Sequence, residues 1–228
     1  MTDVKPILEI ENLTVVYNEN TPFEVVALKD FSLTIQKGEI ILISGGNGSG
    51  KSTLLRAISG AIPIKTGKIR IDGIDISKWR ADKRAKYIAT VHQDTMLGTC
   101  PNLTIQENFQ LANPHKWWSL KPYHLTLSDV QVESIKKTGL PLDSRGASQV
   151  NMLSGGQRQA IAVCLAFEDK KPILLFDEFT SALDTTTAEK VLDLTFSKAK
   201  ENNSTLLMVM HNIRNFNVNY KHIHLDGK

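Results

Sequence analysis

Apolar runs the length of a β-strand recur along the chain and fall into two kinds. In the first third, strand-like runs at 8–10, 13–17 and 31–35 predict an antiparallel β piece. Alternation of apolar and polar residues at 68–73 predicts a further strand at a sheet edge, with its polar face toward solvent. The remaining runs are apolar throughout, as is typical of strands in a buried parallel sheet. They lie at residues 40–43, 173–176 and 205–210, with further strand candidates at 87–91 and 220–228.

Helical periodicity occupies the stretches between these strands. A short helix is expected after the first buried strand, from Thr53 to Ile58, and a longer one over residues 186–200. Between residues 95 and 150, prolines break up the apolar pattern and leave two amphipathic pieces. Those pieces, at 105–111 and 128–138, predict an inserted, mainly helical subdomain.

Composition narrows the class of protein. A chain of 228 residues with 41% hydrophobic content can fill one large α/β domain. No apolar run approaches the length needed to span a bilayer, and the N-terminal stretch lacks the pattern of a secretory signal, so we expect the chain to stay in the cytoplasm. The net charge of +3 is too small to imply a nucleic-acid partner. The basic pairs Lys83-Arg84 and Lys136-Lys137 are interpreted as solvated surface.

The two cysteines, Cys100 and Cys164, provide neither a metal-ligand cluster nor a disulfide framework. Cys164 lies in an apolar run, where we expect it to pack as a small hydrophobic residue. This cysteine usage suits a reducing compartment.

The residues after the strand at 40–43 match the phosphate-binding pattern G-x-x-x-x-G-K-[ST] at every required position. The glycines let successive backbone N–H groups curl around one concavity, and the following helix adds its partial positive charge. The lysine would reach the terminal phosphates, and the serine hydroxyl would be a ligand of Mg²⁺. A glycine-rich turn without a ligand is the alternative. The predicted ATP-binding residues are Gly45, Gly46, Asn47, Gly48, Ser49, Gly50, Lys51, Ser52 and Thr53.

Two adjacent carboxylates, Asp177 and Glu178, follow the buried strand at 173–176. Ligands of open α/β sheets bind at the carboxyl ends of such strands. We expect Asp177 to hold Mg²⁺, directly or through water, and Glu178 to polarise the water that attacks the γ-phosphorus. The alternative is an acidic strand end that turns into solvent, which the phosphate loop in the same chain makes the lesser one.

A second candidate anion site precedes the apolar run at 160–167. Ser154 is a plausible helix N-cap, and two glycines after it expose backbone N–H groups at the helix start. One nucleotide needs only one wrapped cradle, so two cradles suggest a site shared between two copies of the chain. Taken alone, the Ser-Gly-Gly sequence is a weak turn signal.

These observations together predict an α/β fold. We expect a P-loop NTPase core with a mainly parallel sheet, an N-terminal antiparallel β piece and an inserted helical subdomain. Residues 1–93 and 159–228 would form the core of this single domain, and residues 94–158 the helical subdomain. Within that subdomain, the aromatic and basic stretch at 115–123 is either a partner-docking surface or a loop anchored on the helical core.

The order of these motifs resembles the nucleotide-binding subunit of an ATP-binding cassette (ABC) transporter over nearly the whole chain. A Leu-Ser-Gly-Gly-Gln sequence after a phosphate loop, with an acidic pair downstream, is highly specific to that family. The residues that carry the resemblance are Gly45 to Thr53, Gln93, Leu153 to Gln157, Asp177-Glu178, Ser181 to Asp184 and His211.

The resemblance implies a role for each matching residue. Tyr17 is similar to the aromatic residue that stacks on adenine, although a strand residue packed on the core is the alternative. Gln93 resembles the glutamine that touches the metal and the attacking water. Asp184 looks like the aspartate at the dimer interface, and His211 like the histidine that contacts the γ-phosphate and orients the water. The residues expected to contact the nucleotide of the other subunit are Ser154, Gly155, Gly156 and Gln157. The implied catalytic residues are Lys51, Gln93, Glu178 and His211, and the implied metal-contacting residues are Ser52, Gln93 and Asp177.

The resemblance further implies an ATPase that uses ATP and Mg²⁺ and forms a homodimer on binding ATP. It would work with transmembrane permease subunits, and indirectly with a substrate-binding protein, at the inner face of the cell membrane. The segments 102–108 and 205–212 look most like importer ATPases of bacterial amino-acid systems, including those proposed for tryptophan and tyrosine.

Several positions depart from the family pattern. Ala160 and Leu165 stand where many members have arginine, Phe179 where proline is common, and Asn212 where aspartate is common. None of these changes removes a group that touches ATP. The alternative function is a soluble ABC-type ATPase that acts on nucleic acid or in protein assembly. Such relatives usually carry an inserted coiled coil, a second cassette or basic extensions, which this sequence does not show.

Overall fold

A computed structural model describes residues 5–112, 126–210 and 216–226 of the chain. The chain divides into two compact units. The first unit comprises Met1–Thr90, Lys171–Glu178 and Asn203–Lys228, and the second comprises Val91–Lys170 and Phe179–Asn202. Each unit has a hydrophobic core built from its own elements.

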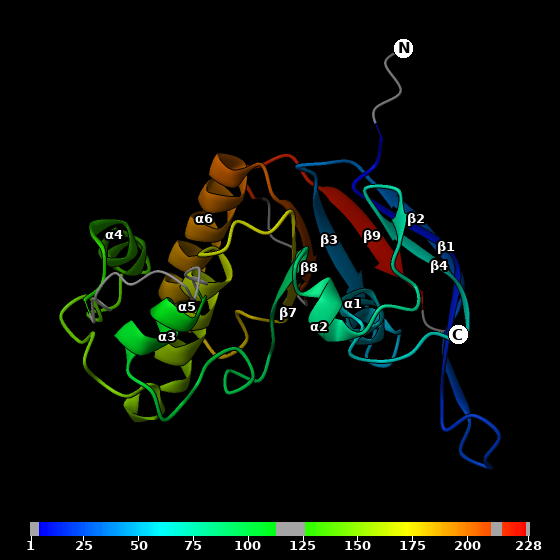
Figure 1. Cartoon of the computed structure of the whole chain (residues 1–228), viewed down its shortest axis with the longest axis horizontal. Coiled ribbons are helices and arrows are strands. Elements are labelled where there is room, and N and C mark those ends of the chain that lie inside the picture. The colour runs from blue at the N-terminus through cyan, green and yellow to red at the C-terminus, as the bar shows by residue number, and fades with distance from the viewer. Residues whose placement is uncertain (1–4, 113–125, 211–215, 227–228) are drawn as a thin grey trace, which may run out of the picture. The chain divides into compact units, whose positions relative to one another are not determined.

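An antiparallel sheet in the first unit is built from the N-terminal strands (Figure 1). β1 (Leu8–Tyr17) pairs with β2 (Val25–Ile35) on one side and with β4 (Thr66–Ile71) on the other. β5 (Ile74–Asp75) pairs with β4, which gives the order β2-β1-β4-β5. The antiparallel β piece is therefore confirmed. The expectation of an edge strand at 68–73 is wrong, because the chain turns back immediately after it and β5 covers that edge.

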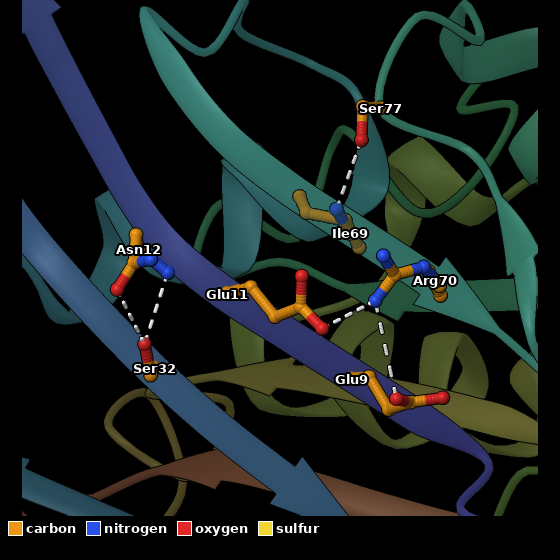
Figure 2. Close-up of polar contacts among 7 residues, drawn as sticks. All are labelled: Glu9, Glu11, Asn12, Ser32, Ile69, Arg70 and Ser77. Carbon is orange, nitrogen blue, oxygen red and sulfur yellow. Dashed lines mark hydrogen bonds and ion pairs between the residues drawn. The ribbon is translucent and has the colours of Figure 1, made fainter.

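Polar contacts tie the strands of this sheet together (Figure 2). The register places Arg70 directly opposite Glu9, and the Arg70 guanidinium contacts both Glu9 and Glu11. The hydrogen bond between Arg70 and Glu11 raises the pKa of the guanidinium and lowers the pKa of the carboxyl group. The backbone N–H of Asn12 donates to Ser32 Oγ at 2.9 Å and links β1 to β2. The alternation of β1 thus separates a polar face from residues buried in the core.

The second sheet of this unit has the strand order β6-β7-β8-β3-β9. β3 pairs in parallel with β8 and with β9, and β7 pairs in parallel with β8. Every residue of β7 and β8 is buried, which confirms the interpretation of continuous apolar runs as strands of a buried parallel sheet. The strands are β3 (Ile40–Gly45), β6 (Ile88–Val91), β7 (Ile173–Asp177), β8 (Thr205–Val209) and β9 (Lys221–Leu225).

The helix α1 (Lys51–Ser59) follows β3, and a buried arginine closes its C-terminal end. Arg84, at the end of the short helix α2 (Ala81–Arg84), is only 2% exposed. Burial lowers the pKa of its guanidinium, and four carbonyl groups accept its N–H groups. The expectation that the Lys83-Arg84 pair is solvated is therefore wrong for Arg84. The acceptor carbonyls belong to Ala57, Ile58, Ser77 and Trp79.

The second unit is helical, as predicted for the insert. Its core contains Ile105, Phe109, Ile135 and Ile161, each of them fully buried. The helices α5 and α6 belong to this unit, whereas the sequence-based division placed residues 159–228 with the other part of the chain. The aromatic stretch at 115–123 lies outside the described residues. The elements are α3 (Ile105–Ala112), α4 (Asp129–Lys137), the 3₁₀ turn η1 (Val150–Met152), α5 (Gly155–Ala166) and α6 (Thr185–Asn202).

Within the described part of the chain, no helix combines the length and the apolar character that crossing a membrane requires.

Candidate nucleotide-binding site

The phosphate loop connects β3 to α1 through a backbone that only glycine can adopt at its two ends. Gly45 has a φ of 147° and Gly50 a φ of 95°. A Cβ atom on Gly45 would lie 2.4 Å from the carbonyl oxygen of Leu225, and one on Gly50 would lie 2.7 Å from that of Ala27. The glycines at these positions therefore let neighbouring backbone approach the loop closely.

The middle of the loop is open. Gly46, Asn47 and Gly48 are exposed, and a Cβ atom on either glycine would meet no atom within 4 Å in the described structure. Gly50 is the N-cap of α1 and provides no side chain to cap the first N–H groups of the helix. An uncapped helix start beside an open loop is the arrangement that anions occupy.

Lys51, the first residue of α1, folds back over the loop. Its side chain is largely buried, with an exposed fraction of 5% for the residue. The Nζ atom donates hydrogen bonds to the carbonyl oxygens of Gly45 and Gly46, each at 2.9 Å. The positive charge is thus held at the loop, where a phosphate group could take the place of these carbonyls as its partner.

Ser52 and Asp177 meet although they lie 125 positions apart in the sequence. The Ser52 hydroxyl donates to Asp177 Oδ1 at 2.9 Å. Asp177 ends the fully buried strand β7, and Ser52 lies in the first turn of α1. A hydroxyl and a carboxylate are both hard oxygen ligands of the kind that Mg²⁺ prefers. The structure therefore brings together two of the three residues predicted to contact the metal.

The loop also contains a buried polar atom without a hydrogen-bond partner in the described structure, as expected where a ligand supplies the partner. Ser49 Oγ is buried and has no hydrogen-bond partner in the described structure. Within residues 5–112, 126–210 and 216–226, no group of three or more His, Cys, Asp or Glu side chains could hold a metal ion. A Mg²⁺ ion held by Ser52 and Asp177 would therefore take its remaining ligands from phosphate groups and water.

Glu178 follows Asp177 with a left-handed backbone conformation, at a φ of 47°. Its N–H donates to the carbonyl oxygen of Val209 at 3.2 Å, which joins the backbone after β7 to the last residue of β8. The side chain is partly exposed, as a residue that meets substrate must be. His211, the other residue expected to orient water, lies outside the described residues.

Tyr17 ends β1 and reaches the start of α1. Its hydroxyl oxygen lies 3.3 Å from Thr53 Oγ1, two residues after the loop lysine. The residue is partly exposed. This position is compatible with a stacking role at the nucleotide.

The serine-glycine-glycine turn begins α5 in the second unit. Ser154 caps the helix as predicted: its Oγ accepts the N–H of Gln157 at 3.3 Å, and Gln157 Oε1 accepts the N–H of Ser154 at 3.1 Å. A Cβ atom on Gly155 would meet nothing within 4 Å in the described structure, so the turn is open at this point. A Cβ on Gly156 would lie 3.2 Å from Leu183 Cδ2, which places the segment before α6 beside the turn.

Asp184 caps the other helix of this region. Its Oδ1 accepts the N–H of Thr187 at 3.0 Å in the first turn of α6. Hydrogen bonds from Thr187 lower the pKa of the Asp184 carboxyl group. Sequence reasoning assigned Asp184 only to a dimer interface and missed this capping role, although an Asp three positions before the Thr of a helical stretch is a capping signal.

Gln93 is exposed, and the backbone around it is held by α5. Gln159 Nε2 donates to the carbonyl oxygen of His92 at 3.2 Å, and Arg158 Nε donates to Thr95 Oγ1 at 3.3 Å. Both contacts fall within the second unit. Sequence reasoning did not anticipate them, because no local pattern indicates which segment a buried glutamine will meet.

The candidate residues are thus distributed over both units. The first unit holds Tyr17, the phosphate loop, Ser52, Asp177 and Glu178. The second unit holds Gln93, the serine-glycine-glycine turn and Asp184. The first group alone contains the glycine cradle, the lysine and the oxygen ligands, so this group forms the phosphate-binding part of the candidate site.

The amino-acid sequence is similar to those of known transport ATP-binding proteins. A tyrosine transport ATP-binding protein from Clostridioides difficile (strain R20291) is 37% identical over 214 residues, which is 91% of this chain and 83% of the relative. A glutamine transport ATP-binding protein from Geobacillus stearothermophilus is 36% identical over 186 residues, 81% of this chain and 74% of the relative.

Solved structures that resemble this chain are also ATP-binding cassettes. The dimeric structure of MJ0796, a bacterial ABC transporter cassette, has a TM-score of 0.78 at 30% identity and covers 96% of this chain and 94% of its own. The same cassette in a post-hydrolysis dimer with ADP and Pi has a TM-score of 0.74 at 30% identity, covering 90% and 88%. Residues 28–181 match the family described as ABC transporter. This chain belongs to the ABC transporter family, as an ATP-binding cassette.

Proposed function

We propose that this chain drives the import of a small solute, of the amino-acid class, through separate permease subunits at the inner face of the cell membrane. The chain itself is an ABC ATPase that binds ATP with Mg²⁺ and hydrolyses it. The proposed cargo class follows from the tyrosine and glutamine transport functions of the relatives described above. Permease partners are proposed because the chain belongs to the ABC transporter family.

The observation that carries the catalytic proposal is the convergence of Lys51, Ser52 and Asp177 at one loop. Lys51 is buried and already bonded to the loop, so its charge needs little reorganisation to meet a phosphate group. The contact between Ser52 and Asp177 pre-positions two oxygen ligands. When bound, Mg²⁺ neutralises charge on the phosphate oxygens. The backbone N–H groups at the start of α1 would add further positive potential.

Glu178 is the proposed general base. It directly follows β7, the strand that ends at Asp177, and the hydrogen bond from its N–H to the Val209 carbonyl holds its backbone in place. A carboxylate there can accept a proton from the attacking water, while Gln93 and His211 are proposed to orient that water. Tyr17 is proposed to stack on the adenine ring.

The serine-glycine-glycine turn is proposed to act on a second copy of the chain. The capping box orders this turn before any partner binds, and Gly155 leaves its face open. An ordered helix start of this kind can bind the γ-phosphate of a nucleotide held by the other subunit. Asp184 lies on the neighbouring segment and is proposed to line the same interface.

A substitution of the proposed base tests this account. We expect Glu178→Gln to abolish turnover while ATP still binds, because the amide keeps the shape of the side chain but cannot accept the proton. Light scattering after gel filtration with ATP and Mg²⁺ should then show a stable dimer. Glu133→Gln, an exposed change on α4, is the matched control and should hydrolyse ATP at the wild-type rate. Undiminished turnover in Glu178→Gln would refute the assignment.

The transport proposal needs a separate experiment. Affinity purification of the Glu178→Gln variant from detergent-solubilised native membranes should recover a polytopic permease. The permease should not be recovered when the variant is unfolded. Measuring uptake of labelled tyrosine and glutamine by cells that lack the gene would then test the cargo class. Stable binding to DNA or ribosomes without any permease would instead support the alternative of a soluble ABC-type ATPase.

A further inference from the structure

Two histidines of β9 converge on one hydroxyl group at the end of β3. The parallel register places His222 opposite Leu42 and His224 opposite Ser44. Because alternate residues of a strand face the same way, both imidazoles lie on one face of the sheet. Ser44 Oγ lies 2.7 Å from His222 Nε2 and 2.8 Å from His224 Nδ1. Two ring nitrogens from alternate positions of β9 are thus directed at a single point.

A carboxylate lies beside the second ring. His224 Nε2 lies 3.4 Å from Asp226 Oδ1, and this contact favours the neutral tautomer that carries its proton on Nε2 and a lone pair on Nδ1. The Ser44 hydroxyl has one proton and can donate it to that Nδ1. Its oxygen then accepts from His222 Nε2. A carboxylate beside the other ring nitrogen is also found around metal-bound histidines.

We propose that Ser44, His222 and His224 mark a binding site for a divalent transition-metal ion such as Zn²⁺, Ni²⁺ or Cu²⁺. Imidazole nitrogen is a preferred ligand of these ions, whereas Mg²⁺ prefers oxygen. Metal–nitrogen bonds are about 2.0–2.1 Å long for Zn²⁺. If the Ser44 side chain rotates away, an ion in the position of its hydroxyl would contact both nitrogens after the two rings move inward from their 2.7 and 2.8 Å distances to that oxygen. This site would be separate from the Mg²⁺ ligands Ser52 and Asp177.

The site is accessible and requires little chemical change. Both histidines are exposed, so an ion can enter from solvent. His222 has only to move its proton from Nε2 to Nδ1, a change of tautomer that leaves the neutral ring without charge. Since the described residues contain no cluster of three or more His, Cys, Asp or Glu ligands, water would complete the coordination. The expected site is therefore a two-nitrogen site with exchangeable positions.

The proposal does not depend on the assignment of the nucleotide site. Titration of the tag-free, full-length chain with NiCl₂, followed by isothermal calorimetry in a buffer without chelators, tests it directly. We expect one site whose affinity falls at least 10-fold in His222→Ala and in His224→Ala. Asp226→Asn should weaken binding by roughly 10-fold, because the carboxylate orients the ring. ZnCl₂ should reproduce this order of variants.

The matched control removes two other histidines. His115→Ala/His124→Ala should bind Ni²⁺ as tightly as the wild type. His222→Gln keeps a hydrogen-bonding side chain beside Ser44, so it provides a folded variant without the imidazole if the alanine variant unfolds. Unchanged Ni²⁺ affinity in His222→Gln and His224→Ala would overturn the proposal, as would an equal loss in the control.

Discussion

Lys51 shows how one buried charge can be both satisfied and ready for a ligand. Its ammonium group bonds to two carbonyl oxygens of its own loop, which offsets the cost of burying the charge. Those carbonyls are neutral acceptors. A phosphate oxygen is a stronger, charged acceptor, so the interaction should strengthen when ATP binds.

We therefore expect Lys51→Ala to weaken ATP binding by at least 10-fold, since a lost hydrogen bond to a charged group is worth about 1.5–3 kcal/mol. Equilibrium binding of a fluorescent ATP analogue measures this. Lys78→Ala, an exposed lysine on the same unit, should bind normally. An unchanged affinity in Lys51→Ala would contradict the cradle account.

Cys164 and Cys100 should differ sharply in reactivity. Burial raises the pKa of the Cys164 thiol to about 12, so little reactive thiolate forms at pH 8. Cys100 is exposed. Iodoacetamide should modify Cys100 in the native chain and reach Cys164 only after guanidinium unfolds it, as read by mass spectrometry of peptides. Rapid native labelling of Cys164, measured also in Cys100→Ser, would show that the core opens easily.

At the scale of elements, Arg84 closes the C-terminal end of α1. Its guanidinium donates hydrogen bonds to the carbonyls of Ala57 and Ile58 in the last turn of the helix, and its positive charge complements the helix dipole. The buried position makes this capping role structural rather than catalytic.

Replacing Arg84 by methionine keeps the side-chain stem but removes the hydrogen bonds that the guanidinium donates to these carbonyls. We expect the free energy of unfolding to fall by about 3 kcal/mol, in the range for buried hydrogen bonds to a charged group. Urea denaturation of the wild type and Arg84→Met measures the difference. Lys86→Met, an exposed change two residues away, should stay within about 0.5 kcal/mol of the wild type. A similar small effect in Arg84→Met would mean that other groups satisfy the helix end.

The stability of the fold should depend on pH through Asp184, whose side chain caps α6. The pKa of Asp184 is lowered in the folded chain by Thr187, so the carboxylate stabilises the fold above the ordinary pKa of aspartate, about 4. That contribution is lost as the pH falls through the lower, folded-state value. The melting temperature of Asp184→Ala should therefore lie below that of the wild type at pH 7, and the gap should narrow at pH 3. Asp193→Ala, an exposed change on the same helix, is the matched control.

Sequence patterns predicted most elements because each type has a local signal. The continuous apolar runs identified β3, β7 and β8, and the Ser154 capping signal identified the start of α5. The failures concern partners that lie far away in the sequence. Whether 68–73 forms an edge depends on what β5 covers, and whether Arg84 is solvated depends on where α1 ends. Composition alone contains neither fact.

At the scale of the whole molecule, the candidate site could likewise be predicted from the sequence only in part. The phosphate loop and the acidic pair could be predicted because their chemistry requires particular residues at fixed spacing. The hydrogen bond from Ser52 to Asp177 and the packing of Leu183 beside Gly156 could not, because each joins distant segments through the tertiary fold. The candidate site residues are distributed over the two units, and the phosphate-binding part lies within the first unit.

The central claim is that two copies of this chain enclose ATP between them, and the most direct test is a crystal structure of Glu178→Gln with ATP and Mg²⁺. The account predicts a two-fold dimer with each triphosphate on Lys51 and Ser52 of one subunit. Ser154 Oγ and the N–H of Gly156 from the partner should lie within hydrogen-bond distance of its γ-phosphate. A structure in which ATP occupies the loop while this turn lies far from every triphosphate, in all assemblies of the crystal, would contradict it.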